Sequence, residues 1–209
     1  MLSQHSSPRR RLAAAGALLF SAALVLTGCS GGLASGGEDA ASSDGPIKLG
    51  MLAPFSGSEA AFGDYMKFGA QLAIDEVNAD GGVDGRDLEL VTEDDACDAA
   101  AAVAAAQKLV TAGVEGSVGG YCSGATLPTL PIFAEAGIPM VIPAANSNEL
   151  VGQGAFMING TGTQQAEAAV EWLTKEGAKT VVIVDDNQAY PKDLADSIEK
   201  QAEGIDIKR

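Results

Sequence analysis

Residues 115–128 have the sequence Glu-Gly-Ser-Val-Gly-Gly-Tyr-Cys-Ser-Gly-Ala-Thr-Leu-Pro, and the rest of the chain is interpreted around them. The apolar run from Val114 to Gly119 predicts a short strand, the glycine pair predicts a turn, and Ser123 is expected to be the N-cap of a helix. The first N–H groups of a helix lack intrahelical acceptors and carry partial positive charge, so such a unit suits a carboxylate or phosphate. An ordinary strand-to-helix connection without a ligand would explain the same residues.

The first 28 residues have the features of an export signal. Three arginines at residues 9–11 precede an alanine-rich apolar run over residues 12–26, which is short for a membrane span. The segment Leu26-Thr27-Gly28-Cys29 resembles the lipobox of bacterial lipoproteins. We therefore expect residues 1–28 to be removed and Cys29 to carry a lipid anchor, either on the outer face of the cytoplasmic membrane or in the periplasm. A short membrane anchor with an incidental cysteine is the alternative.

Charge and composition exclude several functions. The formal net charge is −15 at pH 7, and an acidic surface repels nucleic acid and anionic lipid headgroups. The single histidine, His5, lies in the predicted signal peptide. The exported protein would therefore have no Ser–His or Cys–His nucleophile pair and no histidine metal ligand. We expect no cofactor, no metal and no nucleic-acid partner.

Two cysteines remain once Cys29 is assigned to lipid. Cys97 and Cys122 form one possible pair in an oxidising compartment, where disulfides persist. A bridge between them would close a loop of roughly 25 residues and contribute about 3 kcal/mol in the loop-entropy description. Two separate buried thiols are the alternative.

The region from residue 47 alternates between strand and helix patterns, which predicts an α/β fold with a parallel sheet and helices on both faces. We expect strands at 47–52, 88–92, 114–119 and 138–142, and helices at 62–79, 98–112 and from residue 123. In such sheets a ligand lies beyond the carboxyl ends of the strands. The loops expected to matter are 54–62, 94–98, 119–123 and 143–148.

The chain is expected to contain two lobes. Residues 29–46, rich in Gly, Ser, Ala and acidic residues, predict a flexible tether. Residues 47–159 would form the first lobe, 160–163 a hinge crossover, and 164–209 the start of a second lobe. The second lobe would contain helix 164–176, strand 180–184, helix 191–202 and a strand from residue 205. This unit cannot cover its own sheet, so we expect the sequence to be a fragment of a longer product.

Several motifs from residue 47 onward resemble one known family. They are Phe62-Gly63, the segment Asn78-Ala-Asp-Gly-Gly-Val-Asp-Gly, Glu93-Asp-Asp-Ala-Cys-Asp, Tyr121-Cys-Ser-Gly-Ala-Thr-Leu-Pro, Ile142-Pro-Ala-Ala-Asn and Asp185-Asp-Asn-Gln-Ala-Tyr. The family is that of the substrate-binding proteins of branched-chain amino acid ABC transporters, of the leucine/isoleucine/valine-binding type. The resemblance implies the type I periplasmic-binding-protein fold, with the first lobe nearly complete and the second only begun. It also implies a monomer that binds a small amino acid, catalyses no reaction on it, and delivers it to an ABC transporter permease.

The resemblance assigns site residues by position. Ser123 with the adjacent backbone N–H groups, and the side chain of Asn146, would hold the ligand carboxylate, and the Ala144 carbonyl would accept from the ammonium. Tyr190 would close over the ligand from the second lobe, and Phe62 would wall the side-chain pocket. The family usually has threonine where this chain has Asn146, which alters the contact geometry. The second-lobe acid that meets the ammonium in the family would lie beyond Arg209.

Two other functions compete with transport. The pairs Asp94-Asp95 and Asp185-Asp186 could begin a carboxylate-based metal-dependent enzyme, but the sequence has no glycine-rich phosphate loop. In the alternative interpretation, Asp95 and Asp98 frame the loop that holds Cys97, and Asp98 caps the next helix. A sensor lipoprotein of the same fold, binding an amide, urea or another amino acid, is the other possibility. Trp172 is expected to pack in the core.

Overall fold

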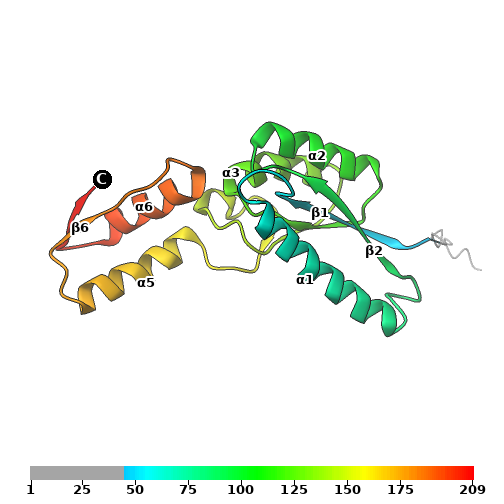
Figure 1. Cartoon of the computed structure of the whole chain (residues 1–209), viewed down its shortest axis with the longest axis horizontal. Helices are drawn as coiled ribbons and strands as arrows, with labels where there is room; N and C mark the ends of the chain where they lie inside the picture. The colour runs from blue at the N-terminus through cyan, green and yellow to red at the C-terminus, as the bar shows by residue number, and fades with distance from the viewer. Residues whose placement is uncertain (1–44) are drawn as a thin grey trace, which may run out of the picture. The chain divides into compact units, whose positions relative to one another are not determined.

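The structure, a computed structural model, describes residues 45–209, and Figure 1 shows the order of its elements. The lipidation site predicted at Cys29, the signal peptide and most of the tether lie outside the described residues. The strands are β1 (Ile47–Ala53), β2 (Leu88–Asp94), β3 (Gly116–Gly119), β4 (Met140–Ile142), β5 (Phe156–Met157), β6 (Thr180–Val182) and β7 (Asp206–Lys208). The helices are α1 (Ala60–Ala79), α2 (Ala99–Thr111), α3 (Ser123–Thr126), α4 (Leu130–Glu135), α5 (Gly162–Lys175) and α6 (Ala189–Gln201), with 3-10 turns η1 (Leu127–Thr129) and η2 (Asn148–Leu150).

The first five strands form one parallel sheet in the order β2-β1-β3-β4-β5. The chain runs from β1 outward to β2. It then crosses back to β3 on the other side of β1 and continues in that direction to β4 and β5. The order therefore reverses between β1 and β3, and a crevice opens there at the carboxyl ends of the strands. The predicted parallel α/β fold is confirmed, and the short β5 adds a strand that the sequence patterns did not identify.

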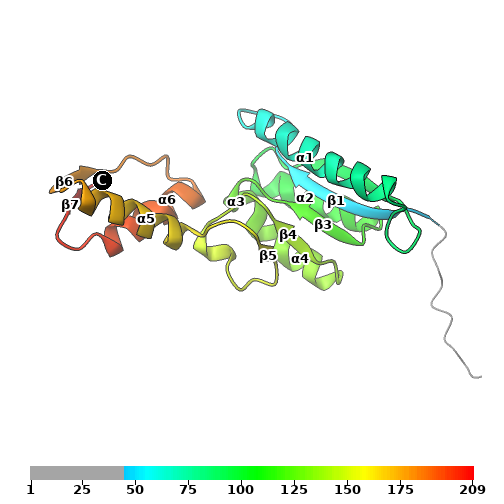
Figure 2. The same ribbon diagram turned by 90° about the horizontal axis from the view of Figure 1, so that it is seen from below.

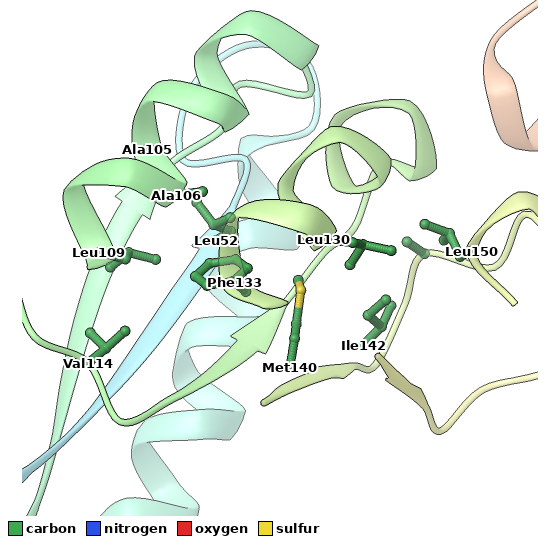
Figure 3. Close-up of a cluster of buried hydrophobic side chains, with 11 residues drawn as sticks. Leu52, Ala105, Ala106, Leu109, Val114, Leu130, Phe133, Met140, Ile142 and Leu150 are labelled. Atoms are coloured by element: carbon green, nitrogen blue, oxygen red, sulfur yellow. The ribbon is translucent and has the colours of Figure 1, made fainter. Parts of the chain in front are cut away.

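The main core of this sheet lies on the face covered by α2 and α4, whereas α1 lies on the other face (Figures 1 and 2). Figure 3 shows Phe133 of α4 at the centre of the cluster, between residues of β1, α2 and β4. The buried members are Leu52, Ala105, Ala106, Leu109, Val114, Leu130, Phe133, Met140, Ile142, Ala145 and Leu150. Alanines on α2 let the helix approach the sheet closely, so that larger residues from both sides fill the space between them.

Helices α1 and α5 bury few residues, and one sequence expectation about burial is wrong. On α1, Gly69 and Ala73 are exposed, and Ile74 is the buried apolar residue of that helix. Trp172 was expected in the core but has 60% of its surface exposed. The apolar patterns of both helices were read correctly as helical, but a helical period does not say which stripe another element covers.

The C-terminal region forms a smaller α/β unit. After Thr161, which makes a capping box with Gln164, α5 begins two residues earlier than expected and leads to the two-stranded parallel sheet β6-β7. Helices α5 and α6 pack against each other. Within residues 45–209, no helix combines the length and apolar character needed to cross a membrane.

Candidate binding cleft

A cavity of about 480 Å³ lies at the crevice where the strand order reverses. Loops that follow β1, β2, β3 and β4 contribute one side, and the segment that follows β6 contributes the other. The lining residues are Ser58, Glu59, Cys97, Tyr121, Cys122, Ser123, Gly124, Ala144, Asn146, Asp186, Gln188, Ala189, Tyr190 and Pro191. Every loop that the sequence singled out therefore supplies at least one lining residue.

The turn after β3 is built from glycines because the neighbouring backbone is close. A Cβ at Gly119 would lie 2.2 Å from the Leu52 carbonyl oxygen, and both Gly119 and Gly120 have positive φ angles, of 150° and 91°. The Gly120 N–H donates to the Leu52 carbonyl at 2.9 Å, and the Ala145 N–H donates to the Gly120 carbonyl at 2.9 Å. These bonds connect the loops after β1, β3 and β4 and fix one wall of the cavity.

Ser123 is not the N-cap that the sequence predicted. Cys122 occupies that position without a side-chain cap, and Ser123 is the first residue of α3. The Ser123 hydroxyl accepts instead from the backbone N–H groups of Asn146 and Ser147, each at 3.2 Å, and only 4% of the residue surface is exposed. Its own proton remains available to donate, and the backbone N–H groups of Ser123 and Gly124 have no intrahelical acceptor. Three donors therefore belong to residues that line this end of the cavity.

The predicted disulfide between Cys97 and Cys122 is confirmed, with 5.3 Å between the Cα atoms. Both cysteines line the cavity, so the bridge is part of its wall as well as a link between the loops after β2 and β3. Ala96 and Cys97 have positive φ angles of 47° and 55°, an uncommon conformation for residues with a Cβ. The Cys97 N–H donates to the Asp95 carboxylate at 2.9 Å, which supports this turn.

The two aspartates before this turn differ in their proton affinity. Burial raises the pKa of the Asp95 carboxyl, since the bond from the Cys97 N–H only partly offsets the loss of solvent and Asp94 adds repulsion. At Asp94, burial also acts to raise the pKa, but hydrogen bonds from Ser56, Ala96 and Phe55 outweigh it and lower the pKa.

The helix cap predicted at Asp98 is confirmed, because the Asp98 side chain accepts from the Ala101 N–H at 2.8 Å. Asp94 and Asp95 thus serve the local structure of the loop.

Ala144 and Asn146 lie on the loop after β4 and both line the cavity. The Ala144 carbonyl already accepts from the Asn159 side-chain amide at 2.8 Å, which holds the peptide in place and leaves its second lone pair. The Asn146 carbonyl accepts from the Gly162 N–H at 2.7 Å, so this loop is bonded directly to the first residue of α5. Asn159 is a supporting residue that sequence reasoning did not identify.

Phe62 is not among the lining residues. Its ring stacks on that of Tyr121, with 4.9 Å between centroids and 16° between planes, and Tyr121 faces the cavity. Burial raises the pKa of the Tyr121 hydroxyl, and the charge of Glu59 and a hydrogen bond to that carboxylate raise it further. Phe62 therefore contacts a residue that lines the cavity. Both Tyr121 and Glu59 lie in loops that the sequence indicated, but nothing in their spacing distinguished them from other loop residues.

The other side of the cavity comes from the start of α6 and the loop before it. Tyr190 lines the cavity, and its hydroxyl donates to the Gln165 side chain on α5. A Cβ at Gly124 would lie 3.4 Å from the Ala189 Cβ, so α3 and α6 meet closely at a residue without a side chain. Four of the five ligand residues expected from the sequence, Ser123, Ala144, Asn146 and Tyr190, thus share one cavity.

A second cavity, of about 680 Å³, lies beside η2, α5 and α6. Its polar groups are largely paired with each other: the Asn148 side-chain amide donates to Asp193 at 3.0 Å, and its carbonyl accepts from the Thr163 N–H at 3.0 Å. The Asn148 backbone N–H also donates to Asp193 at 2.8 Å. This cavity surrounds a connection between the two α/β units and offers few free groups to a ligand. Within residues 45–209, no cluster of three or more His, Cys, Asp or Glu side chains could hold a metal ion.

These features define a class of protein. A parallel α/β unit with a cavity at its switch point, faced by a second and smaller α/β unit, is the architecture of a bilobed ligand-binding protein. Comparisons with known proteins give the family. A profile of the periplasmic binding protein family matches residues 46–208.

Characterised relatives agree with this match. The chain is 36% identical over 166 residues to a leucine-, isoleucine-, valine-, threonine- and alanine-binding protein of Pseudomonas aeruginosa, covering 78% of this chain and 44% of that protein. It is 40% identical over 155 residues to the Leu/Ile/Val-binding protein BraC3 of Rhizobium johnstonii, covering 72% and 42%. Among solved structures, the LivJ branched-chain amino acid transporter substrate-binding protein of Streptococcus pneumoniae, in complex with isoleucine, matches with a TM-score of 0.72 and 32% identity over 77% of this chain and 48% of that one.

The chain belongs to the periplasmic binding protein family. Its relatives include substrate-binding proteins of branched-chain amino acid transporters, the group that its motifs resemble. Members of this family bind substrates without catalysing a reaction, which excludes the enzyme interpretation. The chain spans less than half the length of these relatives.

Proposed function

We propose that this chain forms the first lobe and the beginning of the second lobe of an extracytoplasmic lipoprotein that binds a small amino acid and delivers it to an ABC transporter permease. Branched-chain amino acids are the first ligands to test, because the names of the relatives specify leucine, isoleucine and valine. The proposal includes a signal peptide over residues 1–28, a lipid on Cys29 and a hinge at residues 160–163.

The observation that carries the proposal is the group of donors at Ser123. A ligand carboxylate there would accept from the Ser123 hydroxyl and from the backbone N–H groups of Ser123 and Gly124, with the Asn146 side-chain amide alongside. Hydrogen bonds within the chain fix these groups, so little orientation is lost when a carboxylate binds. The free lone pair of the Ala144 carbonyl would accept from the ligand ammonium.

Closure of the second lobe would complete the site. Tyr190, Ala189 and Pro191 already face the first lobe across the cavity. A ligand that contacts both lobes favours the closed arrangement by its better contacts there, and the permease would recognise that arrangement. Exposed Val182 and Val184 beside β6 support the view that further residues complete the second lobe in the full-length protein.

Ser123→Ala in the full-length protein tests the carboxylate site. It removes the hydroxyl donor and the acceptor that holds the Asn146 and Ser147 N–H groups, so the affinity for the amino acid should fall by about 1.5 to 3 kcal/mol in titration calorimetry. Ser123→Thr keeps the hydroxyl and is the matched control, which should bind within a few-fold of the wild type. Unchanged affinity in Ser123→Ala would show that the carboxylate binds elsewhere.

A ligand-sensing lipoprotein of the same fold would use the same cleft. The two functions separate in cells: deletion of the gene should abolish saturable uptake of the ligand if the protein serves transport. Intact uptake after deletion would favour sensing.

A further inference from the structure

The peptide bond between Ala144 and Ala145 is held from both sides. Its N–H donates to the Gly120 carbonyl at 2.9 Å, and its carbonyl accepts from the Asn159 side-chain amide at 2.8 Å. The same amide also donates to the Ala145 carbonyl at 3.3 Å. Within residues 45–209, no other protein group donates to either carbonyl. The direction of the Ala144 carbonyl therefore depends on Asn159.

The backbone on both sides of Asn159 is bonded to the same loop. The Ile158 N–H donates to the Ile142 carbonyl at 3.1 Å, and the Gly162 N–H donates to the Asn146 carbonyl at 2.7 Å. Because these bonds already hold the backbone in place, the Asn159 side chain loses little further freedom when it bridges the two carbonyls. Asn159 itself lies behind the wall, since it is not among the residues that line the cavity.

The other end of the Asn159 amide is unpaired. Its oxygen is buried and has no hydrogen-bond partner in the described part of the chain. If the amide were turned round, that oxygen would face the two carbonyl oxygens, so the carbonyls determine its orientation. A buried acceptor without a partner is unfavourable and uncommon in folded proteins. What this polar side chain contributes is therefore its pair of donors to the Ala144 and Ala145 carbonyls.

A fixed carbonyl matters most for a ligand group that needs an acceptor. An ammonium group loses water when it enters a cavity, and this loss is offset only if acceptors of the protein replace the water. The second lone pair of the Ala144 carbonyl can do so without first being ordered. The carboxylate and the side chain of the same ligand make no use of this acceptor, so its direction should not affect them.

We propose that Asn159 is a positioning residue, which does not contact the ligand but fixes the Ala144 carbonyl for the ligand ammonium. The inference rests on the proposed function, in which this carbonyl accepts from the ammonium of an amino acid. It predicts that a change at Asn159 affects an amino acid and its deaminated analogue differently.

The test compares leucine with isocaproate, which has the same carboxylate and side chain but no ammonium, by titration calorimetry on the full-length protein. Asn159→Leu keeps the approximate size of the side chain and removes both donors. The affinity for leucine should fall about tenfold, because a hydrogen bond to a charged group is weakened. The affinity for isocaproate should change little, which also shows that the variant is folded. Asn159→Gln keeps the amide on a longer side chain and should retain part of the preference for leucine.

Asn78→Leu is the matched control. The Asn78 side chain also bonds to two backbone groups, since it donates to the Leu88 carbonyl at 2.9 Å and accepts from the Leu88 N–H at 2.7 Å. It does not line the cavity. The same substitution there should lower the stability and leave the ratio of the two affinities unchanged.

Two results would overturn this inference and leave the proposed function standing. One is an Asn159→Leu variant with the same preference for leucine over isocaproate as the wild type, whether or not both affinities fall. The other is a wild type that binds the two compounds equally, since the ammonium would then have no acceptor. If the wild type bound none of the standard amino acids, the proposed function itself would be wrong, and this inference with it.

Discussion

The two sides of the cleft differ in how they are held. The first lobe places its lining residues on a sheet with a continuous core, in which Phe133 has only 1% of its surface exposed. The C-terminal unit buries only the small apolar residues Ala166, Ala195 and Ala202, and it exposes 60% of Trp172, 69% of Val182 and 89% of Val184. One side of the site is thus fixed by hydrophobic packing, and the other depends on polar contacts such as those of Asn148 with Asp193.

The difference follows from the number of strands. Five strands with helices on both faces can bury a cluster of large side chains, whereas two strands and two helices leave one sheet face open. A binding cleft needs one rigid side that orients the ligand and one side that can move. In the proposed closure we expect the five-stranded unit to be the rigid side and the C-terminal unit to be the side that moves.

The strongest test of this difference in packing is to truncate one large side chain in each of the two units. Phe133→Ala should cost about 3 to 5 kcal/mol of unfolding free energy, because it leaves a cavity in the core. Trp172→Ala removes a larger side chain, but one that is mostly exposed, so its cost in the 209-residue chain should be much smaller. Urea unfolding of both variants measures this. Equal losses would mean that the C-terminal unit has a core of its own.

Removal of the disulfide should have the next largest effect. Replacing Cys97 and Cys122 together by alanine should destabilise the first lobe by about 3 kcal/mol, since the bridge closes a loop of roughly 25 residues. The change should also weaken ligand binding, because both cysteines line the cavity. Thermal unfolding with and without a reductant checks the stability, and the wild type in reductant should behave like the double variant. A double variant as stable as the oxidised protein would contradict the prediction.

A change at the contact between the two sides should have a smaller effect. Gly124→Ala should be tolerated, because its Cβ would meet Ala189 at an ordinary contact distance of 3.4 Å. The additional methyl groups of Gly124→Val would push α6 away, and overpacking of this kind costs about 1 to 3 kcal/mol. The loss should appear in the affinity for the ligand in calorimetry, with the unfolding of the first lobe little changed. Similar affinities for the two variants would show that α6 need not approach α3.

The smallest expected effect concerns pH. Because burial raises the pKa of Asp95, the native state binds this proton more tightly than the unfolded state. Its contribution to stability is therefore greatest below the unfolded pKa and is lost as the pH rises through the folded pKa. Asp95→Asn, which keeps an acceptor for the Cys97 N–H, should become more stable relative to the wild type as the pH rises.

Asp94 provides the matched comparison with the opposite sign. Its lowered pKa contributes stability above the unfolded value, which is lost as the pH falls, so Asp94→Asn should be less stable than the wild type at neutral pH. Urea unfolding between about pH 3 and pH 7 measures both differences. The same pH dependence in both variants would contradict the assignment of the two carboxyl groups.

The sequence predicted much of the site because loop position is encoded locally. The glycine pair before Tyr121, the spacing of Cys97 and Cys122, and the motif residues at Ala144, Asn146 and Tyr190 led to residues that line one cavity. What it missed depends on contacts between distant segments. Asn159 supports the Ala144 peptide from 15 residues away, and Phe62 lies behind Tyr121 rather than in the wall.

The sequence by itself determined the parallel α/β fold, the family and the loops that meet at the cleft, because strand and helix periods, turn glycines and short motifs act over a few residues. The tertiary structure alone decided how individual groups are used. The Ser123 hydroxyl accepts from the loop after β4 instead of capping its helix, Trp172 is exposed, and the Phe62 ring stacks on Tyr121. These outcomes depend on which segments pack together, and a hydrogen-bond partner or a covering surface from a distant segment leaves no local pattern in the chain.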